Sequence, residues 1–254
     1  MTQHIRTPRR SEEAATTVLS RVSNHPPSPP SASTHAQTLD RGLRALELLA
    51  EHPDGLSVSE LAAALDTHRA GVYRLLAPLG DHHLVRRDED GRFTLAPGLI
   101  ELAAGVRPRL QEVAAPVLQR LADGLRATAA LTIRDGDEAV VAMVVPPREP
   151  RMHLTYRPGM RHPLTRGAPG HVLLAAMPAR PGEPAAAIKA RGQGYAVSSG
   201  QLLPGATGVA AAIAAPGNEP DAAISAVWIE GLDPDSVAAD VVAAAAQIAD
   251  QLRR

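Results

Sequence analysis

Residues 56–95 read LSVSELAAALDTHRAGVYRLLAPLGDHHLVRRDEDGRFTL and contain two apolar stripes at helical spacing, separated by a short polar turn. Ser57 and Glu60 have the spacing of a capping box, so a helix is predicted to begin after Ser57 and to end near Asp66. Its apolar positions repeat at i, i+3, i+4 and i+7 and are Val58, Leu61, Ala62 and Leu65. We therefore expect this face to be buried and Ser59 to point outward.

A second helix is predicted after Thr67, whose hydroxyl is a candidate N-cap. Its apolar stripe consists of Val72, Leu75, Leu76 and Leu79, and its opposite face carries His68, Arg69, Tyr73 and Arg74. Ala70 and Gly71 leave the first turn without bulky side chains, which allows a partner to approach the backbone closely. Pro78 is predicted to kink or end the helix near Ala77, because proline lacks an N–H and clashes with the preceding turn.

The flanking segments complete a small module. Upstream, Thr38 is a candidate cap for a helix whose apolar face is predicted to consist of Leu39, Leu43, Leu46 and Ala50. Downstream, Leu84–Asp88 and Arg92–Leu95 flank Asp90-Gly91, which is a strong signal for a hairpin. Three helices followed by a charged hairpin are typical of a winged helix-turn-helix, which lays one helix into the major groove of DNA. We therefore predict double-stranded DNA as a partner.

The predicted DNA contacts come from the outward face of the second helix, the turn before it and the hairpin. Arginine can hydrogen-bond guanine or a phosphate, and tyrosine can contact a phosphate or a thymine methyl group. Residues 37–105 hold seven arginines against eleven acidic residues, so attraction that ignores sequence should be modest and dimerisation should supply further affinity. The candidate contacts are Ser59, Thr67, His68, Arg69, Ala70, Gly71, Tyr73, Arg74, Arg86, Arg87 and Arg92.

The chain of 254 residues is long enough for two domains. We expect a disordered tail at 1–36, the DNA-binding module at 37–98, a linker or helix at 99–109 and a second domain at 110–254. No apolar run reaches 18 residues and no export leader is seen, so a cytoplasmic location is expected. The absence of cysteine excludes disulfides, thiol catalysis and cysteine-ligated zinc, and neither a metal nor a cofactor is expected.

The second domain is predicted to be α+β, with a GAF-like antiparallel sheet and helices to one side of it. A continuous apolar stripe predicts a long helix over 107–126, and a second stripe from Val237 to Leu252 predicts a last helix. Shorter helices are expected near 170–177 and 185–190. The six predicted strands are Ala130–Arg134, Ala139–Val145, Met152–Tyr156, Tyr195–Ser198, Val209–Ala215 and Ala222–Trp228.

The chain resembles the IclR family of transcription regulators. In the first domain the resemblance rests on Val72-Tyr73-Arg74-Leu75-Leu76, with Asp40-Arg41 and the run from Ser59 to Ala62. In the second domain it rests on Gly159–Leu164 and Gly194–Val197. The resemblance implies a regulator that acts as a homodimer or homotetramer and whose second half binds a small molecule. Repression of target genes is our working hypothesis.

The resemblance also implies where an effector binds. The loop Gly167-Ala168-Pro169 matches the family segment whose backbone amides hold an effector carboxylate, but Pro169 has no N–H to donate. The composition of the predicted pocket, which also includes Ala210 and Ile213, suits a fairly apolar ligand. The candidate effector contacts are Leu131, Met143, Arg166, Gly167, Ala168, Ser198, Gly208, Ser225 and Val227.

Two other interpretations remain open at this point. The second domain could be a packed core that only oligomerises, which would make the chain a constitutive or architectural DNA-binding regulator. A small-molecule enzyme is the other alternative, with His153, His162 and His171 as conceivable bases and Ser198, Ser225 and Asp221 as partners. No catalytic motif supports it, so we predict that the chain is not an enzyme.

Overall fold

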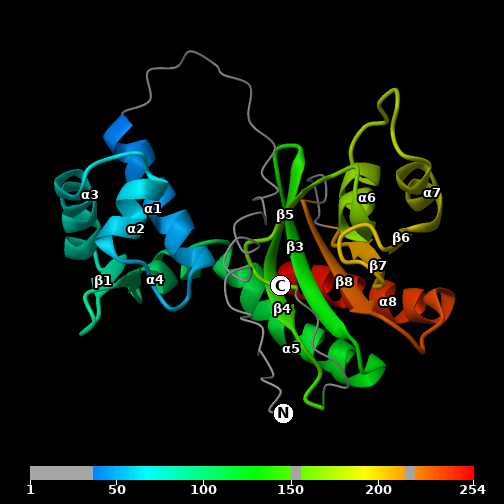
Figure 1. Ribbon diagram of the computed structural model, residues 1–254. Helices are drawn as coiled ribbons and strands as arrows, with labels where there is room; N and C mark the ends of the chain where they lie inside the picture. The colour runs from blue at the N-terminus through cyan, green and yellow to red at the C-terminus, as the bar shows by residue number, and fades with distance from the viewer. Residues whose placement is uncertain (1–36, 150–155, 215–220) are drawn as a thin grey trace, which may run out of the picture. The chain divides into compact units, whose positions relative to one another are not determined.

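The computed structural model describes residues 37–149, 156–214 and 221–254 (Figure 1). The chain divides into two compact units, one ending at Gly98 and the other beginning at Leu99. The predicted tail at 1–36 lies outside the described residues. The first unit contains α1 (Gln37–Glu51), α2 (Val58–Ala64), α3 (Arg69–Asp81), β1 (Val85–Arg87) and β2 (Phe93–Leu95), and α4 (Gly98–Ala104) begins at the boundary.

Helices α2 and α3 follow the predicted patterns. Ser57 and Glu60 form both bonds of the capping box: the Ser57 N–H donates to the Glu60 carboxylate over 2.7 Å, and the Glu60 N–H donates to the Ser57 hydroxyl over 3.2 Å. The buried residues of the two helices are Val58, Leu61, Ala62, Leu65, Val72, Leu75 and Leu76, with Leu79 partly buried beside them. The two predicted stripes are therefore confirmed as the core of this unit.

Helix α1 buries a different face from the predicted one. Gly42, Ala45 and Leu49 are buried, whereas Leu39 is 64% exposed and Leu43 is 51% exposed. The predicted cap Thr38 lies inside the helix, which extends at least one residue further back. Ala45 and Leu49 belong to the core of this unit, where α1 packs against α3 and β2. Leucine spacing alone did not reveal this because both faces of α1 carry apolar residues.

Two predictions about α3 were wrong. The N-cap position is taken by His68 and not by Thr67, and the His68 side chain makes no capping bond. A positive φ of 47° at Asp66 and a bond from the Thr67 N–H to the Ala62 carbonyl tighten the turn, so that the helix begins one residue later. The helix also continues through Pro78 to Asp81 and does not end near Ala77, whereas a kink at Pro78 stays a prediction. The helix continues because Leu79 still packs against the core, and the missing N–H lies on the exposed side.

The hairpin is confirmed, with a longer loop than a two-residue turn. β1 and β2 pair antiparallel, and the pair Asp88 and Arg92 closes a three-residue loop through the bond from the Asp88 N–H to the Arg92 carbonyl. Gly91 has a φ of 80°, as a loop of this length requires at its last position. Leu56 adds a short bridge to Phe93, so the wing is tied to the start of α2.

The second unit is built on an antiparallel sheet in the order β5-β4-β3-β8-β7-β6. Its strands are β3 (Thr128–Asp135), β4 (Glu138–Val145), β5 (Arg161–Pro163), β6 (Tyr195–Ser199), β7 (Thr207–Ala212) and β8 (Ala222–Trp228). Its helices are α5 (Pro108–Leu125), α6 (Gly167–Ala175), α7 (Ala185–Gln193) and α8 (Pro234–Leu252). No helix in the described ranges is long and apolar enough to cross a membrane. Because helices accompany an antiparallel sheet in this unit, the fold is α+β, as predicted.

The strand predicted at Met152–Tyr156 lies almost entirely outside the described residues. Residues 152–155 lie outside the described part of the chain, and Tyr156 itself is not in a strand. Among the described residues, the strand that follows β4 is β5 (Arg161–Pro163), which was not predicted and pairs with the start of β4. Three residues give too short an alternation to be recognised from sequence.

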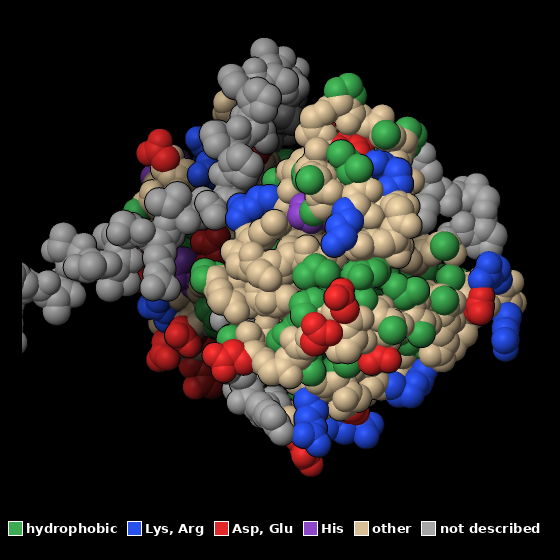
Figure 2. Space-filling view, turned by 90° about the vertical axis from the view of Figure 1, so that its right-hand side faces the viewer, with side chains coloured by type: hydrophobic (Ala, Val, Ile, Leu, Met, Phe, Trp, Pro, Cys, Tyr) green, Lys and Arg blue, Asp and Glu red, His purple; other side chains and the backbone are tan. Residues whose placement is uncertain are grey.

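Helices cover both faces of the sheet, and not one face as predicted (Figure 1). α5 and α8 pack on the face that carries Leu131, Ile224 and Trp228, whereas α6 and α7 pack on the face that carries Ala210 and Ala223. All seven residues of β8 are buried, and Ser225 is the one polar residue among them, so its sequence has no polar alternation to indicate an exposed face. On the side of unit 2 that carries α7 and α8, exposed hydrophobic side chains lie in a band with charged residues around it (Figure 2).

Candidate nucleic-acid interface and ligand cavity

The outer face of α3 carries an exposed polar surface. Arg69, Tyr73 and Arg74 are exposed, as are His68 and Ala70 in the first turn. Within the described residues neither Arg69 nor Arg74 forms an ion pair. Their guanidinium donors are therefore available to an outside partner.

Gly71 does not fit the predicted surface. It is buried, and a Cβ at this position would lie 2.5 Å from the Thr67 hydroxyl oxygen. The glycine is thus required by packing within the α2–α3 turn and is not a place where a partner reaches the backbone. Ser59 on α2 is exposed, as predicted from its position opposite the apolar stripe.

Phe93 joins α3 to the wing. The Tyr73 ring packs edge-on against the Phe93 ring with centroids 6.5 Å apart, and the Arg87 guanidinium lies 5.8 Å from the Phe93 centroid. Arg87 also donates to the Gly91 carbonyl within the hairpin over 3.2 Å. Arg86 is exposed and forms no ion pair with a described residue. Of the two neighbouring arginines on β1, Arg87 is therefore held within the wing through its Nε and its contact with Phe93, whereas Arg86 has no such contact.

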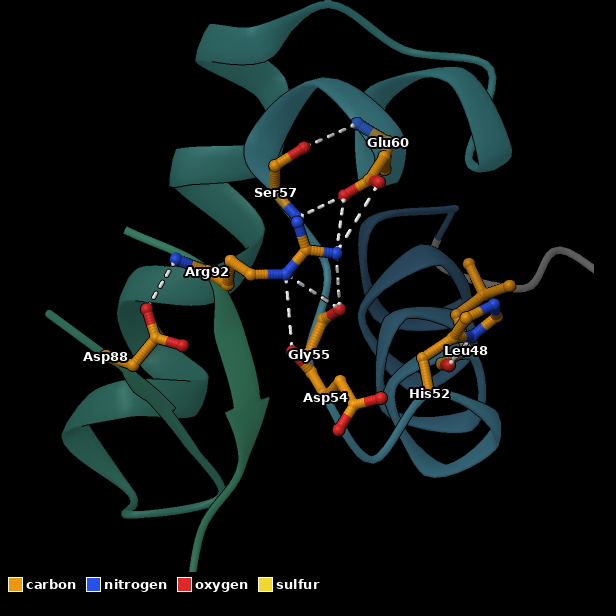
Figure 3. Close-up of polar contacts among 8 residues, drawn as sticks. All are labelled: Leu48, His52, Asp54, Gly55, Ser57, Glu60, Asp88 and Arg92. Carbon is orange, nitrogen blue, oxygen red and sulfur yellow. Dashed lines mark hydrogen bonds and ion pairs between the residues drawn. The ribbon is translucent and has the colours of Figure 1, made fainter. Parts of the chain in front are cut away.

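Arg92 departs from its predicted role as a DNA contact (Figure 3). Its guanidinium donates to the carbonyl of Gly55 over 2.9 and 3.2 Å and to the carbonyl of Asp54 over 3.2 Å. It also lies 3.2 Å from the Glu60 carboxylate, which belongs to the capping box of α2. Arg92 thus holds the α1–α2 turn and the start of α2 against the wing. Sequence spacing could not reveal this, because the partners lie 32 to 38 residues earlier.

Hydrogen bonds with Ser57 lower the pKa of Glu60 more than the nearby Arg92 does. Hydrogen bonding with Ser57, through its backbone N–H first and its hydroxyl second, holds the pKa of Glu60 below its ordinary value of 4.5. Arg92 lowers the same pKa by a smaller amount. The carboxylate is therefore ionised at neutral pH and remains a partner for Arg92.

In the second unit, four of the predicted effector contacts meet around one cavity. Ser198, Gly208, Ser225 and Val227 line a space of about 30 Å³ together with Tyr156, Pro169, Gln201, Leu202, Leu203 and Ala206. Neighbouring strands bring them together, since Ser198 pairs with Gly208 and Gly208 with Val227. Tyr156 and the loop from Gly200 to Ala206 were not predicted. Only the glycines at positions 200 and 205 signalled that loop.

Leu131, Met143 and Ile213 are corrections to the predicted pocket. Leu131 pairs with Met143 across β3 and β4, and all three side chains belong to the core under α5 and α8, on the other face of the sheet. Because side chains alternate along a strand, the residues that face the cavity side are Ala130 and Thr132. Ala210 lies on the cavity side but packs against α6 and α7.

The backbone amides at the start of α6 are already bonded within the chain. The Gly167 N–H donates to the side-chain oxygen of Gln201 over 2.7 Å, and the Ala168 N–H donates to the Ser198 hydroxyl over 2.8 Å. The Arg166 guanidinium donates to the Gln201 backbone carbonyl on the exposed side. Arg166, Gly167 and Ala168 are thus close to the cavity, but their donors are engaged by the polypeptide itself.

The histidines proposed for an enzyme do not meet the proposed nucleophiles. His162 donates through Nδ1 to the Pro163 carbonyl and His171 through Nε2 to the Thr165 carbonyl, each over 3.1 Å. Burial lowers the pKa of both imidazoles below the ordinary value of 6.5. His153 lies outside the described residues.

A winged helix-turn-helix joined to a sheet domain with an internal cavity is the architecture of a DNA-binding transcription regulator. The IclR helix-turn-helix domain model matches residues 38–89, and the model described as bacterial transcriptional regulator IclR C-terminal matches residues 104–189. The chain belongs to the IclR family. The C-terminal model is described as that of a transcriptional regulator, in agreement with the prediction of a regulator and not an enzyme.

Individual relatives agree with this assignment. The HTH-type transcriptional regulator Rv1719 of Mycobacterium tuberculosis is 37% identical over 144 residues, which cover 56% of this chain and 55% of that protein. TtgV, an HTH-type transcriptional regulator of Pseudomonas putida, is 31% identical with the same coverage. The chain therefore spans about half the length of the curated relatives it matches.

Solved structures share the fold. The IclR protein of Thermotoga maritima superimposes with a TM-score of 0.70 at 22% identity, covering 87% of this chain and 100% of that one. An IclR homologue from Microbacterium hydrocarbonoxydans, complexed with 4-hydroxybenzoate, gives a TM-score of 0.73 at 23% identity, with coverage of 85% and 99%.

Proposed function

We propose that this chain is a cytoplasmic transcription repressor that binds operator DNA as a homodimer or homotetramer and whose grip on DNA changes when a small effector binds. The observation that carries the proposal is the exposed face of α3, where Arg69 and Arg74 have no ion pair among the described residues while the opposite face is buried. In winged helix-turn-helix proteins, a helix with one buried apolar face and one exposed polar face enters the major groove.

Each side chain on this surface has a proposed role. Arg69, in the first turn of α3, reads a base edge, and Arg74, one turn later, holds a phosphate. Tyr73 and His68 contact the sugar-phosphate backbone beside them. Ser59 on α2 and Arg86 on the wing hold phosphates at the two edges of the site. Arg87 serves the wing through Phe93 more than the DNA.

Oligomerisation is supported by apolar side chains that the fold leaves exposed. Leu39 and Leu43 on α1 are more than half exposed, as are Ile100 and Leu102 on α4. A second copy of the chain would bury them, and two copies of α3 would then read the half-sites of a near-palindromic operator. The acidic balance of the module makes this second contact necessary for useful affinity.

Competition binding tests the proposal. Full-length protein is mixed with DNA from upstream of its own gene, and the affinity is compared with that for a scrambled duplex. Arg69→Ala is expected to lose about 1–3 kcal/mol of discrimination between the two duplexes. Arg74→Ala is expected to weaken both alike and to lower the salt dependence by about one counterion. If both variants bind as the unaltered chain does, α3 does not read DNA through this face.

One observation favours a second candidate function, a regulator whose C-terminal unit only oligomerises. The cavity of about 30 Å³ is far smaller than the roughly 300–1,000 Å³ of ligand pockets. A metabolite screen by thermal shift separates the two functions, because an effector raises the unfolding temperature with concentration.

A further inference from the structure

The cavity in the second unit is closed by one loop. The loop from Gly200 to Ala206 is held at its base by the bond from the Gly200 N–H to the Ala206 carbonyl, over 2.8 Å. Gln201 reaches the Gly167 amide, and Leu202 lies so close to Gly167 that a Cβ there would be 2.5 Å from a Leu202 methyl. Leu202 and Leu203 line the cavity. Removing this loop from its place would enlarge the space without disturbing any strand of the sheet.

Two buried hydroxyl groups in the cavity wall have no hydrogen-bond partner among the described residues. They are the hydroxyls of Ser225 and Tyr156, in residues that are 0% and 5% exposed; the buried hydroxyl of Thr132, close enough to Tyr156 to lower its pKa slightly, is likewise without a hydrogen-bond partner. An unpaired buried hydroxyl costs about 1–3 kcal/mol, so two of them in one wall need an explanation. A ligand that bonds to both would remove this cost.

The wall is poorly suited to an anion. Pro169 has no N–H, and the Ala168 amide is bonded to Ser198, which lies on β6 and not on the loop. Of the amides in the wall, opening the loop would therefore free only that of Gly167; the Arg166 guanidinium, which would also lose its bond to the Gln201 carbonyl, lies on the exposed side and does not line the cavity. No arginine or lysine in the described ranges lines the cavity. Burial raises the pKa of Tyr156 to about 12, opposed by a smaller effect of the Thr132 hydroxyl, so this environment disfavours a negative charge.

A wider depression in the same unit lacks these features. It measures about 680 Å³ and is formed by the end of α5, the start of β3 and the segment that follows β8. None of its lining side chains is a buried polar group without a partner. Of the two hollows, the small cavity is therefore the one whose wall carries buried hydroxyl groups that a ligand can bond.

We propose that the loop Gly200–Ala206 is a lid over the effector site and that the ligand it admits is an uncharged molecule whose hydroxyl or amide groups pair with Ser225 and Tyr156. This inference rests on the proposed function, because it defines the effector class of the same regulator. Gln201 and Leu202 occupy the entrance when the lid is closed, and the ligand replaces both. Binding therefore competes with the chain's own Gln201–Gly167 bond.

Calorimetric titration of the full-length protein with two matched pairs of probes tests the proposal. The pairs are benzamide with benzoate and 4-hydroxybenzamide with 4-hydroxybenzoate, which differ mainly in charge. We expect an amide to bind and its acid to bind at least tenfold more weakly. Gln201→Ala and Leu202→Ala are expected to tighten amide binding about two- to tenfold, because closing the lid then competes less. Ser199→Ala is the matched control, since Ser199 bonds to Thr207 outside the cavity.

A second readout keeps the test independent of folding. In the lid variants the Gly167 amide should exchange its hydrogen faster, while the Ala168 amide, bonded to Ser198, should not change. Tighter binding of the acids than of the amides overturns the proposal. The proposal is also overturned if neither amide binds to the parent chain or to either lid variant. Operator binding measured on the same samples separates this failure from failure of the proposed function: operator binding without amide binding rejects only the lid proposal.

Discussion

Replacement of Arg92 by alanine is expected to destabilise the first unit. In the structure its guanidinium donates to the carbonyls of Asp54 and Gly55 and lies beside Glu60. Hydrogen bonds to a charged group contribute about 1.5–3 kcal/mol, but 37% of the Arg92 side chain and 50% of the Glu60 side chain are exposed. After this discount we expect the free energy of unfolding to fall by about 2 kcal/mol. Nearly all of this loss comes from the hydrogen bonds to the carbonyl of the buried residue Gly55. Such a loss multiplies the open population of the unit by roughly 30.

Amide hydrogen exchange on the full-length chain measures this loss directly. The Leu56 and Phe93 amides, which bond to each other's carbonyls, should exchange roughly 30-fold faster in Arg92→Ala. Arg86→Ala is the control, because Arg86 is an exposed arginine of the same wing; it should lower DNA affinity and leave exchange unchanged. Unchanged exchange in Arg92→Ala, together with a salt slope reduced by one, would refute the reasoning and return Arg92 to the set of phosphate contacts.

Three further predictions concern single positions. Ser225→Ala should keep or raise the free energy of unfolding by up to about 2 kcal/mol, because it removes a buried hydroxyl without a partner; urea denaturation measures it. Stability should fall as the pH drops below about 6.5, because the buried His162 and His171 have lowered pKa values and the unfolded chain then binds more protons than the folded chain; urea midpoints from pH 7.5 to 5 test this. Gly71→Ala should destabilise the chain, whereas the same change in a Thr67→Ala background should not, because the obstructing hydroxyl is gone; thermal unfolding of the four proteins measures the coupling.

Each of these has an outcome that contradicts it. Ser198→Ala is the control for Ser225, since its hydroxyl accepts the Ala168 N–H and its loss should cost about 1 kcal/mol; a larger cost at Ser225 would mean that its hydroxyl is bonded after all. Midpoints that do not change with pH, or that rise on acidification, would contradict the burial of neutral imidazoles. Additive effects at positions 67 and 71 would show that the two side chains do not compete for space.

Features set by neighbouring residues were predictable from the sequence. The capping box of α2 needs only Ser57 and Glu60, and Gly91 in the wing follows from the geometry of one loop. The stripes of α2 and α3 were unambiguous because their other faces are polar. The buried face of α1 was ambiguous, since both of its faces are apolar. The face that is buried in the structure carries the smaller residues Gly42 and Ala45.

Features set by distant residues were not predictable. Leu131 and Met143 were predicted to line the pocket, but the phase of β3 against β4, which shifts between Leu131 and Thr132, decides which side of the sheet they face. The Arg92 contacts join segments that only the folded chain brings together. The Gly200–Ala206 loop was missed for the same reason, because its meaning depends on what lies beneath it.

The internal use of Arg92 has a consequence for how a protein of this kind would search a chromosome. Each guanidinium committed to a carbonyl is one fewer cation for the duplex, in a module that is already acidic. Few condensed counterions are then displaced on random DNA, so encounters with unrelated sequence are brief and sliding is short. On the proposed function, time spent bound is then governed by the base edges that α3 meets, and occupancy of a cognate site is expected to tolerate changes in intracellular salt.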